Sequence, residues 1–290
     1  MTKFIVSIVA CITLTSNTFA QAKINLSAEK DYVITPADYG LKFEELKIET
    51  PDKKGDNTPV NLFGWHLIPN DKTSKKAIII ASDGQGNMSY MLDYAGVFLG
   101  QNFHVFMFDY RGYGKSDEFN VSNKFFIYAQ FATDLNAVVD YTKKYYATYS
   151  IDIFGKGIGA GLALGVGANN NKVYRVIADS PYTTLETIEK RYAEKNAGGK
   201  IFMPIAYDKA LVEPTNALKE KGEHLRGVLF IVGASGEYST LADVQSLAEM
   251  RKKVSTIYTV PGVGNDQTYM ASKDEYFNQV KAFYDKFGGL

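Results

Sequence analysis

The chain has almost no cysteine and few histidines. Its 290 residues include one cysteine, Cys11, and three histidines, His66, His104 and His224. A single thiol excludes an intramolecular disulfide, and no two histidines have the short spacing of a zinc site. Basic and acidic residues balance at 32 each, so no charge excess favours nucleic acid or an anionic membrane surface. We expect no metal and no cofactor.

Long hydrophobic runs are also missing, apart from one near the N-terminus. That run, residues 4–14, follows the basic Lys3 and precedes a polar stretch that ends in Ala20. This layout predicts that residues 1–20 are a secretory signal peptide, and the run is too short to span a bilayer. A less favoured alternative is a lipid anchor at Cys11. We therefore expect an exported protein, periplasmic or secreted, that contains no cysteine after cleavage.

Strand and helix patterns alternate along the rest of the chain. Alternating polar and apolar residues over 41–50 and 60–69 predict an antiparallel hairpin. Further strands are expected at 75–82, 103–110, 150–154, 172–179, 227–233 and 254–260, and helices at about 88–100, 124–147, from 158, 183–221, 240–252 and 273–287. This order predicts an α/β fold with an open, mostly parallel sheet and helices on both faces. No repeat or linker divides it, so we predict one domain over 25–290.

Several stretches at the ends of predicted strands, or in the loops that follow them, carry recognisable motifs. They read FGWHLIP (63–69), SDGQGNMS (82–89), FDYRGYGKSD (108–117), ADSPYTTL (178–185) and PGVGNDQTYM (261–270). Together they resemble the α/β-hydrolase superfamily, and within it the cap-less BEM46-like and dienelactone-hydrolase-like serine hydrolases. The resemblance covers about residues 36–287. It implies about eight strands, no large cap domain, and hydrolysis of esters or other acyl compounds by a catalytic triad.

The three triad positions hold residues that cannot perform this chemistry. In the superfamily the nucleophile is the serine of G-x-S-x-G, and here the frame GKGIG places Gly157 at that point. By the same resemblance the acid position is Gly236 and the base position is Asn265. No histidine follows residue 224, and removing the serine or histidine of a comparable triad costs about a million-fold in turnover. We therefore expect a pseudoenzyme that binds a ligand or a protein of the cell envelope.

Backbone groups of the former active site could still bind a ligand. The resemblance implies an oxyanion hole formed by main-chain N–H groups, and a glycine turn that opens a helix presents free N–H groups and a positive dipole end. The expected ligand is a small acyl compound, carboxylate or phosphate. The predicted ligand-binding residues are Asp83, Gly84, Gln85, Lys156, Gly157 and Ile158.

Two other interpretations stay open. The first is an atypical ester or amide hydrolase with a relocated nucleophile, for which Ser82, Ser180 and Ser235 are the candidates and Lys156 is the basic group that could activate one of them. The second is a dinucleotide site, because GKGIGA matches G-x-G-x-x-A and Asp179 ends the next predicted strand. The dinucleotide interpretation leaves the FDYRGYGKSD motif without a purpose.

Overall fold

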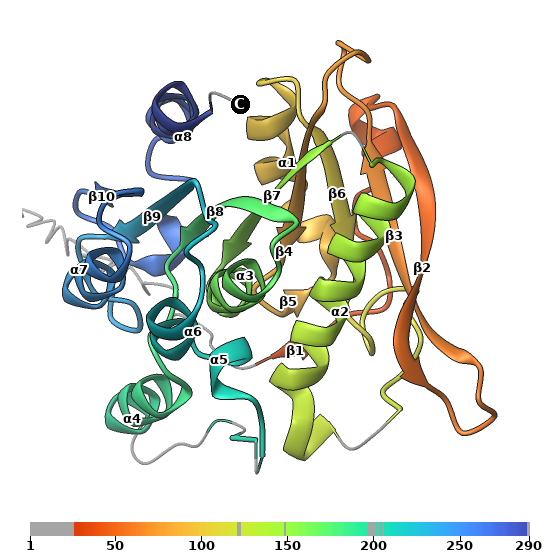
Figure 1. Cartoon of the computed structure of the whole chain (residues 1–290), viewed down its shortest axis with the longest axis horizontal. Helices are drawn as coiled ribbons and strands as arrows, with labels where there is room; N and C mark the ends of the chain where they lie inside the picture. The colour runs from red at the N-terminus through yellow and green to blue at the C-terminus, as the bar shows by residue number, and fades with distance from the viewer. Residues whose placement is uncertain are drawn as a thin grey trace, which may run out of the picture.

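An eight-stranded sheet forms the centre of the molecule (Figure 1). The structure is a computed structural model that describes residues 26–120, 123–147, 149–196, 201, 203–204 and 206–288. In spatial order, the strands are β10 (Ser255–Val260), β9 (Gly227–Gly233), β8 (Val173–Asp179), β7 (Ser150–Lys156), β4 (Lys76–Ala81), β6 (His104–Phe108), β3 (Pro59–Leu67) and β2 (Phe43–Lys53). The predicted signal peptide, with Cys11, lies outside the described residues.

Strand pairing is parallel from β10 to β6 and antiparallel at the other edge. The strands β2 and β3 form the predicted hairpin, and β3 also pairs antiparallel with β6. In β4, Ile79 belongs to the core on one face of the sheet, whereas Ile78 and Ile80 belong to the core on the other face. This two-residue period explains why a continuous apolar run forms a strand that is covered on both sides. The predicted α/β fold with a mostly parallel sheet is confirmed.

Helices cover both faces of the sheet. On one face lie α1 (Leu92–Leu99) and α8 (Lys273–Phe287); on the other lie α2 (Asn123–Tyr145), α3 (Ile158–Asn169), α4 (Leu185–Lys195), α5 (Lys209–Val212), α6 (Pro214–Glu220) and α7 (Leu241–Met250). Helix α3 is buried from Ile158 to Ala168, as expected for a helix that is apolar all round. None of the helices in the described part of the chain is both long and apolar enough to cross a membrane.

Several short elements have no counterpart in the sequence prediction. The strands β1 (Ser27–Ala28) and β5 (Gln85–Gly86) pair in parallel and form a separate two-stranded sheet. Two single turns of 3-10 helix, η1 (Pro36–Tyr39) and η3 (Asn265–Gln267), lie in loops, whereas a third, η2 (Met88–Met91), opens the helix expected at about 88–100. Elements of two to four residues are too short to show a period in the sequence.

The carboxyl ends of the parallel strands meet at one edge of the sheet. The loops that follow β4, β7, β8 and β9 therefore lie next to one another, which is where open α/β sheets place their binding sites. The residues that the sequence analysis selects in the glycine turn and in the loops after β4 and β9 all belong to this edge.

Candidate functional site

Gly157 forms a sharp turn between β7 and α3. Its backbone angles, φ 54° and ψ −117°, lie in a region that L-residues rarely adopt. A Cβ at this position would meet only the Cβ of Asp83, at 3.2 Å. The turn thus has the strained backbone expected of a nucleophile elbow, and it carries no side chain.

The two flanking glycines are required by close packing of the backbone. A Cβ on Gly155 would lie 2.2 Å from the carbonyl oxygen of Gly159, and a Cβ on Gly159 would lie 2.3 Å from the carbonyl oxygens of Ala81 and Ser82. Both distances are far below van der Waals contact. Close packing of β7 against α3 at Gly155, and of α3 against the end of β4 at Gly159, therefore requires both glycines.

The loop after β9, where the resemblance places the acid, is held by Asn265. The Oδ1 atom of Asn265 accepts hydrogen bonds from the N–H groups of Glu237, Tyr238 and Ser239, at 3.0, 3.2 and 3.3 Å. Its Nδ2 donates to the carbonyl oxygen of Ser239 at 2.9 Å. A Cβ on Gly236 would lie 2.3 Å from the same carbonyl oxygen and 2.5 Å from that Nδ2, so the loop backbone and the amide together leave no room for a side chain at this position.

Glu237, the acidic residue nearest to the acid position, faces a different partner. Its carboxylate forms an ion pair with Lys195 on α4, with 2.8 Å between the two charged atoms, and 57% of its side chain is exposed. It does not line the pocket beside the glycine turn. Glu237 therefore does not replace the acid.

The three histidines lie away from the glycine turn. The Nε2 of His66 lies 2.9 Å from the Nδ1 of His104, which begins β6 at the opposite end of the parallel strands. The hydroxyl of Tyr146 lies 3.1 Å from the Nδ1 of His66, and the hydroxyl of Tyr149 lies 3.2 Å from the Nε2 of His104. Burial lowers the pKa of His66 to about 4, and His104 adds to this. His224 contacts backbone carbonyls beside α3, so no histidine reaches the pocket.

A small pocket of about 40 Å³ lies beside the glycine turn. This volume holds a few water molecules or the end of a small ligand. The lining residues come from the loops after β4, β7, β8 and β9, from α4 and from the loop after β10: Asp83, Lys156, Gly157, Ile158, Ser180, Tyr182, Ile188, Tyr238, Asn265 and Asp266. The structure thus brings together four of the six predicted ligand-binding residues, Asp83, Lys156, Gly157 and Ile158.

Gly84 and Gln85, the other two predicted ligand-binding residues, do not line this pocket. A Cβ on Gly84 would lie 2.3 Å from the Cδ2 of Leu26, and its carbonyl oxygen accepts a hydrogen bond from the N–H of Ser27. The segment around β1 therefore covers the loop after β4. No local signal in the sequence links residues so far apart.

Lys156 is the buried cation of the pocket. It is 8% exposed, and its Nζ donates to the carbonyl oxygen of Asn265 at 3.3 Å. Burial raises the pKa of Asp83 and of Asp179, and the nearby ammonium of Lys156 acts in the opposite direction on both. Asp266 adds a third carboxylate at the rim. The sequence analysis did not select Asp266 as a site residue, although it follows the predicted base position directly.

Asp179 is fully occupied by hydrogen bonds inside the protein. Its carboxylate accepts from the hydroxyls of Thr268, Tyr276 and Ser180, at 2.7, 2.9 and 2.9 Å, and it is completely buried. A dinucleotide site needs this carboxylate free to bind a ribose. The hydrogen bonds of Asp179 therefore argue against the dinucleotide interpretation.

Only one of the three candidate serines faces the pocket. Ser82 is buried under the turn and Ser235 is exposed in the loop after β9, and neither lines the cavity. Ser180 lines it and has a positive φ of 59°. Its hydroxyl lies 3.3 Å from the Asn265 carbonyl oxygen that Lys156 also contacts.

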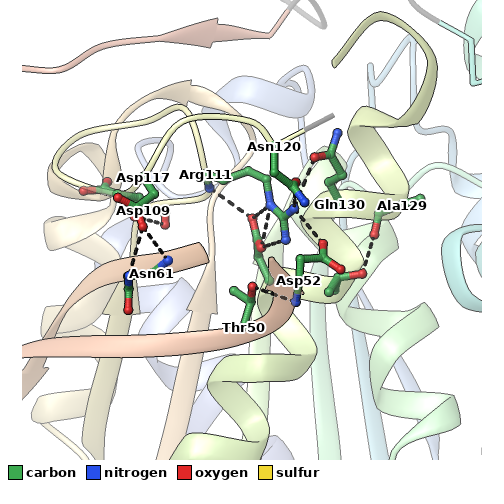
Figure 2. Close-up of polar contacts among 12 residues, drawn as sticks. Thr50, Asp52, Asn61, Asp109, Arg111, Asp117, Asn120, Ala129 and Gln130 are labelled. Atoms are coloured by element: carbon green, nitrogen blue, oxygen red, sulfur yellow. Dashed lines mark hydrogen bonds and ion pairs between the residues drawn. The ribbon is translucent and has the colours of Figure 1, made fainter. Parts of the chain in front are cut away.

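The FDYRGYGKSD motif connects the sheet to α2. Figure 2 shows the buried Arg111 guanidinium bonded to Asp52, Asn120 and Gln130, at 2.7, 2.7 and 3.2 Å. On α2, the carboxylate of Asp134 accepts hydrogen bonds from Nε and Nη2 of the same guanidinium, and neither side chain is exposed. The motif therefore has a structural role here.

Comparisons with known proteins agree with this fold. The family model "Serine aminopeptidase, S33" matches residues 73–210. Among curated proteins, Protein bem46 of Schizosaccharomyces pombe is 24% identical over 162 residues, which are 54% of this chain and 50% of that protein. The α/β-hydrolase domain-containing protein WAV2 of Arabidopsis thaliana is 26% identical over 159 residues, 54% of this chain and 48% of that protein. This chain spans about half the length of these relatives.

Solved structures resemble the fold over most of the chain. An esterase of Pyrococcus furiosus matches with a TM-score of 0.71 at 20% identity, covering 91% of this chain and 98% of the esterase. A serine hydrolase without a lid from Xanthomonas campestris matches with a TM-score of 0.57 at 14% identity, covering 84% and 94% of the two chains. From the motifs, the family model and these relatives together, we conclude that the chain belongs to the α/β-hydrolase superfamily.

Proposed function

We propose that this protein is a non-hydrolysing member of the superfamily that binds a small ligand or an envelope protein. The observation that carries the proposal is the glycine turn. Gly157 has the backbone of a nucleophile elbow and offers no atom that could attack a carbonyl carbon. Asn265 binds the loop in which the acid would stand, and the three histidines lie elsewhere. Acyl transfer needs a nucleophile and a base in contact, and these residues provide neither.

The pocket beside Gly157 is the proposed ligand site. Ile158 begins α3, so its N–H has no carbonyl partner within the helix and can donate to a ligand oxygen. The ammonium of Lys156 favours a carboxylate or phosphate, whereas Asp83 and Asp266 oppose a further negative charge. Burial raises the pKa of Asp83, and a bound anion beside it would raise this pKa further. Binding of an anion would therefore favour uptake of a proton by the Asp83 carboxylate. We expect the affinity for acetate to rise as the pH falls.

The ligand site can be tested with acetate and inorganic phosphate as probes. Each would be titrated into the protein while the amide resonance of Ile158 is followed by NMR at two pH values. We expect a saturable shift at Ile158 that is larger at the lower pH. No shift at millimolar concentrations of either anion would contradict an anion site and would favour a protein partner.

The absence of hydrolysis is tested with chromogenic esters of short and medium chain length. The purified protein at micromolar concentration would be compared with a boiled sample. We expect equal rates in the two samples. A saturable rate that survives repurification would contradict the proposal.

A relocated nucleophile is the second candidate, and Ser180 is the specific observation in its favour. Its positive φ is unusual for serine, and strained residues cluster at active sites. It shares an acceptor with Lys156, the cation of the pocket. If hydrolysis is found, Ser180→Ala should abolish it and Ser235→Ala should leave it intact. The reverse result would place the nucleophile in the loop after β9.

We also propose that the protein is exported, either to the periplasm or out of the cell. The support is the layout of the N-terminal sequence, with Lys3, an apolar run and Ala20. N-terminal sequencing of the mature protein should then begin at Gln21. A mature protein that begins at a lipid-modified Cys11 would favour the anchored form instead.

A further inference from the structure

A second pocket lies at the opposite edge of the sheet, where the parallel strands begin. Its volume is about 660 Å³, which is the size of a small-molecule site. The residues around it come from the segment before β4, the turn after α1, the starts of β7 and β8, and α8. This pocket is separate from the one beside Gly157, and the inference drawn from it is independent of the proposed function.

Arg175 on β8 is a buried cation with unused hydrogen-bonding capacity. It lines the pocket and is 2% exposed. Its Nε donates to the carbonyl oxygen of Phe287 at 2.8 Å, and its Nη1 lies 3.3 Å from Asp152. Within the described part of the chain, Nη2 has no hydrogen-bond partner. Buried polar atoms are nearly always paired, so an unpaired guanidinium nitrogen beside a cavity is available to a water molecule, an anion or a ligand.

Asp152 contacts only the Nη1 nitrogen of the Arg175 guanidinium. Burial raises the pKa of Asp152 to about 6, although Arg175 and the Tyr284 hydroxyl counteract this effect. The ion-pair distance of 3.3 Å is longer than the usual charge-assisted hydrogen bond. The base of the pocket therefore keeps one guanidinium nitrogen, Nη2, that Asp152 does not occupy.

Lysines at the rim add positive charge to the pocket. Lys76 donates to the carbonyl oxygen of Gln101 at 2.6 Å and lies 4.7 Å from the centre of the Phe103 ring. Among the described residues, Lys75 and Lys76 form no ion pair with a carboxylate, and both line the pocket.

The carboxylates at the rim, by contrast, have partners of their own. Asp71 accepts hydrogen bonds from the backbone N–H and the hydroxyl of Thr73, at 2.9 and 2.7 Å. Asp285 pairs with Lys281 at 2.8 Å, one turn away on α8. Counted by formal charge, the lining holds one more cation than carboxylates: Lys75, Lys76, Arg175 and Lys281 against Asp71, Asp152 and Asp285.

Aromatic rings supply the apolar part of the pocket. Phe103, Phe277 and Tyr284 all line it, from the turn after α1 and from α8. Flat rings beside cationic groups suit a ligand that has an apolar body and one negative group. We propose that this pocket binds a small organic anion, a carboxylate, sulfonate or phosphate on a flat apolar body, whose charged group lies between Lys76 and Arg175.

Calorimetric titration of the full mature protein with 2-naphthoate tests this proposal, with the uncharged 2-naphthamide as the matched ligand. We expect 2-naphthoate to bind at least tenfold more tightly than the amide. Lys76→Gln should weaken the binding of 2-naphthoate at least fivefold. Lys115→Gln is the matched control, because Lys115 also lies 4.7 Å from a ring centre, that of Phe63, but does not line the pocket. Circular dichroism would show that both variants are folded.

Three results would overturn the proposal. They are equal affinity for acid and amide, equal weakening by the two lysine substitutions, and no binding heat at millimolar 2-naphthoate. Displacement of 2-naphthoate by an equal concentration of inorganic phosphate would overturn the role of the rings. None of these results bears on the pocket beside Gly157, which lies at the other edge of the sheet.

Discussion

Asn265 and Gly236 are sterically linked, because the Nδ2 of Asn265 lies 2.5 Å from the position that a Cβ on residue 236 would occupy. By resemblance these are the base and acid positions of the triad. The asparagine amide forms a set of hydrogen bonds to the loop after β9. An aspartate at 236 would collide both with this amide and with the carbonyl oxygen of Ser239, which would lie 2.3 Å from its Cβ.

Asn265→Ala should destabilise the protein strongly. It removes the acceptor of three N–H groups and the donor to Ser239, and buried groups left without partners cost about 1–3 kcal/mol each. We expect a loss of about 2–4 kcal/mol in the free energy of unfolding, measured by urea denaturation. The exposed neighbour Asp266→Ala is the control and should change stability by no more than about 0.5 kcal/mol. Similar losses in the two variants would contradict the role of the amide.

The glycines of the turn should differ in their tolerance of alanine. Gly157→Ala meets only Asp83 and mainly adds backbone strain, about 1–3 kcal/mol. Gly159→Ala places a Cβ against two carbonyl oxygens of β4 and its loop, so we expect a loss above about 4 kcal/mol or no folded protein. Thermal unfolding, monitored by circular dichroism, would rank the two variants by stability. A more stable Gly159→Ala variant would refute this description of the turn.

The buried pair of Arg111 and Asp134 should be sensitive to the loss of one partner. Asp134→Asn leaves a buried guanidinium without its main counter-ion, which typically costs about 3–5 kcal/mol. Glu249→Gln makes the same chemical change in an exposed pair with Lys252 and should cost less than about 0.5 kcal/mol. Both would be measured by guanidinium chloride denaturation. Equal effects would show that the FDYRGYGKSD motif does not hold α2 to the sheet.

The histidine pair should make stability depend on pH. The pKa of His66 is about 4 in the folded protein and about 6.5 in the unfolded chain, so the unfolded state binds more protons between these values. Its contribution to stability therefore increases with pH over this window, by about 3 kcal/mol in total. His66→Gln should remove this part of the dependence. An unchanged slope of stability against pH in the variant would contradict burial of a neutral His66.

The regular elements of the fold were predictable because their residues follow a clear period. The helix expected at 273–287 and the strand expected at 227–233 have these bounds in the structure. The pairing of β1 with β5 was not predictable, because two-residue strands show no period and the two strands are far apart in the sequence.

The candidate site was predictable only where its residues are neighbours in the chain. The glycine turn was identified from five consecutive residues, 155–159. The hydrogen bonds of Asn265 to residues 237–239 depend on how two loops pack at the sheet edge, and the burial of Lys156 depends on the same packing. Such contacts leave no mark in a single sequence.

The most direct test of the proposed loss of catalysis is the intact mass of the protein after incubation with a fluorophosphonate, which forms a covalent adduct with activated serines. The account predicts no mass increase, under conditions in which an active serine esterase is fully labelled. An adduct of one fluorophosphonate per chain, mapped to Ser82, Ser180 or Ser235, would contradict it and would identify the nucleophile.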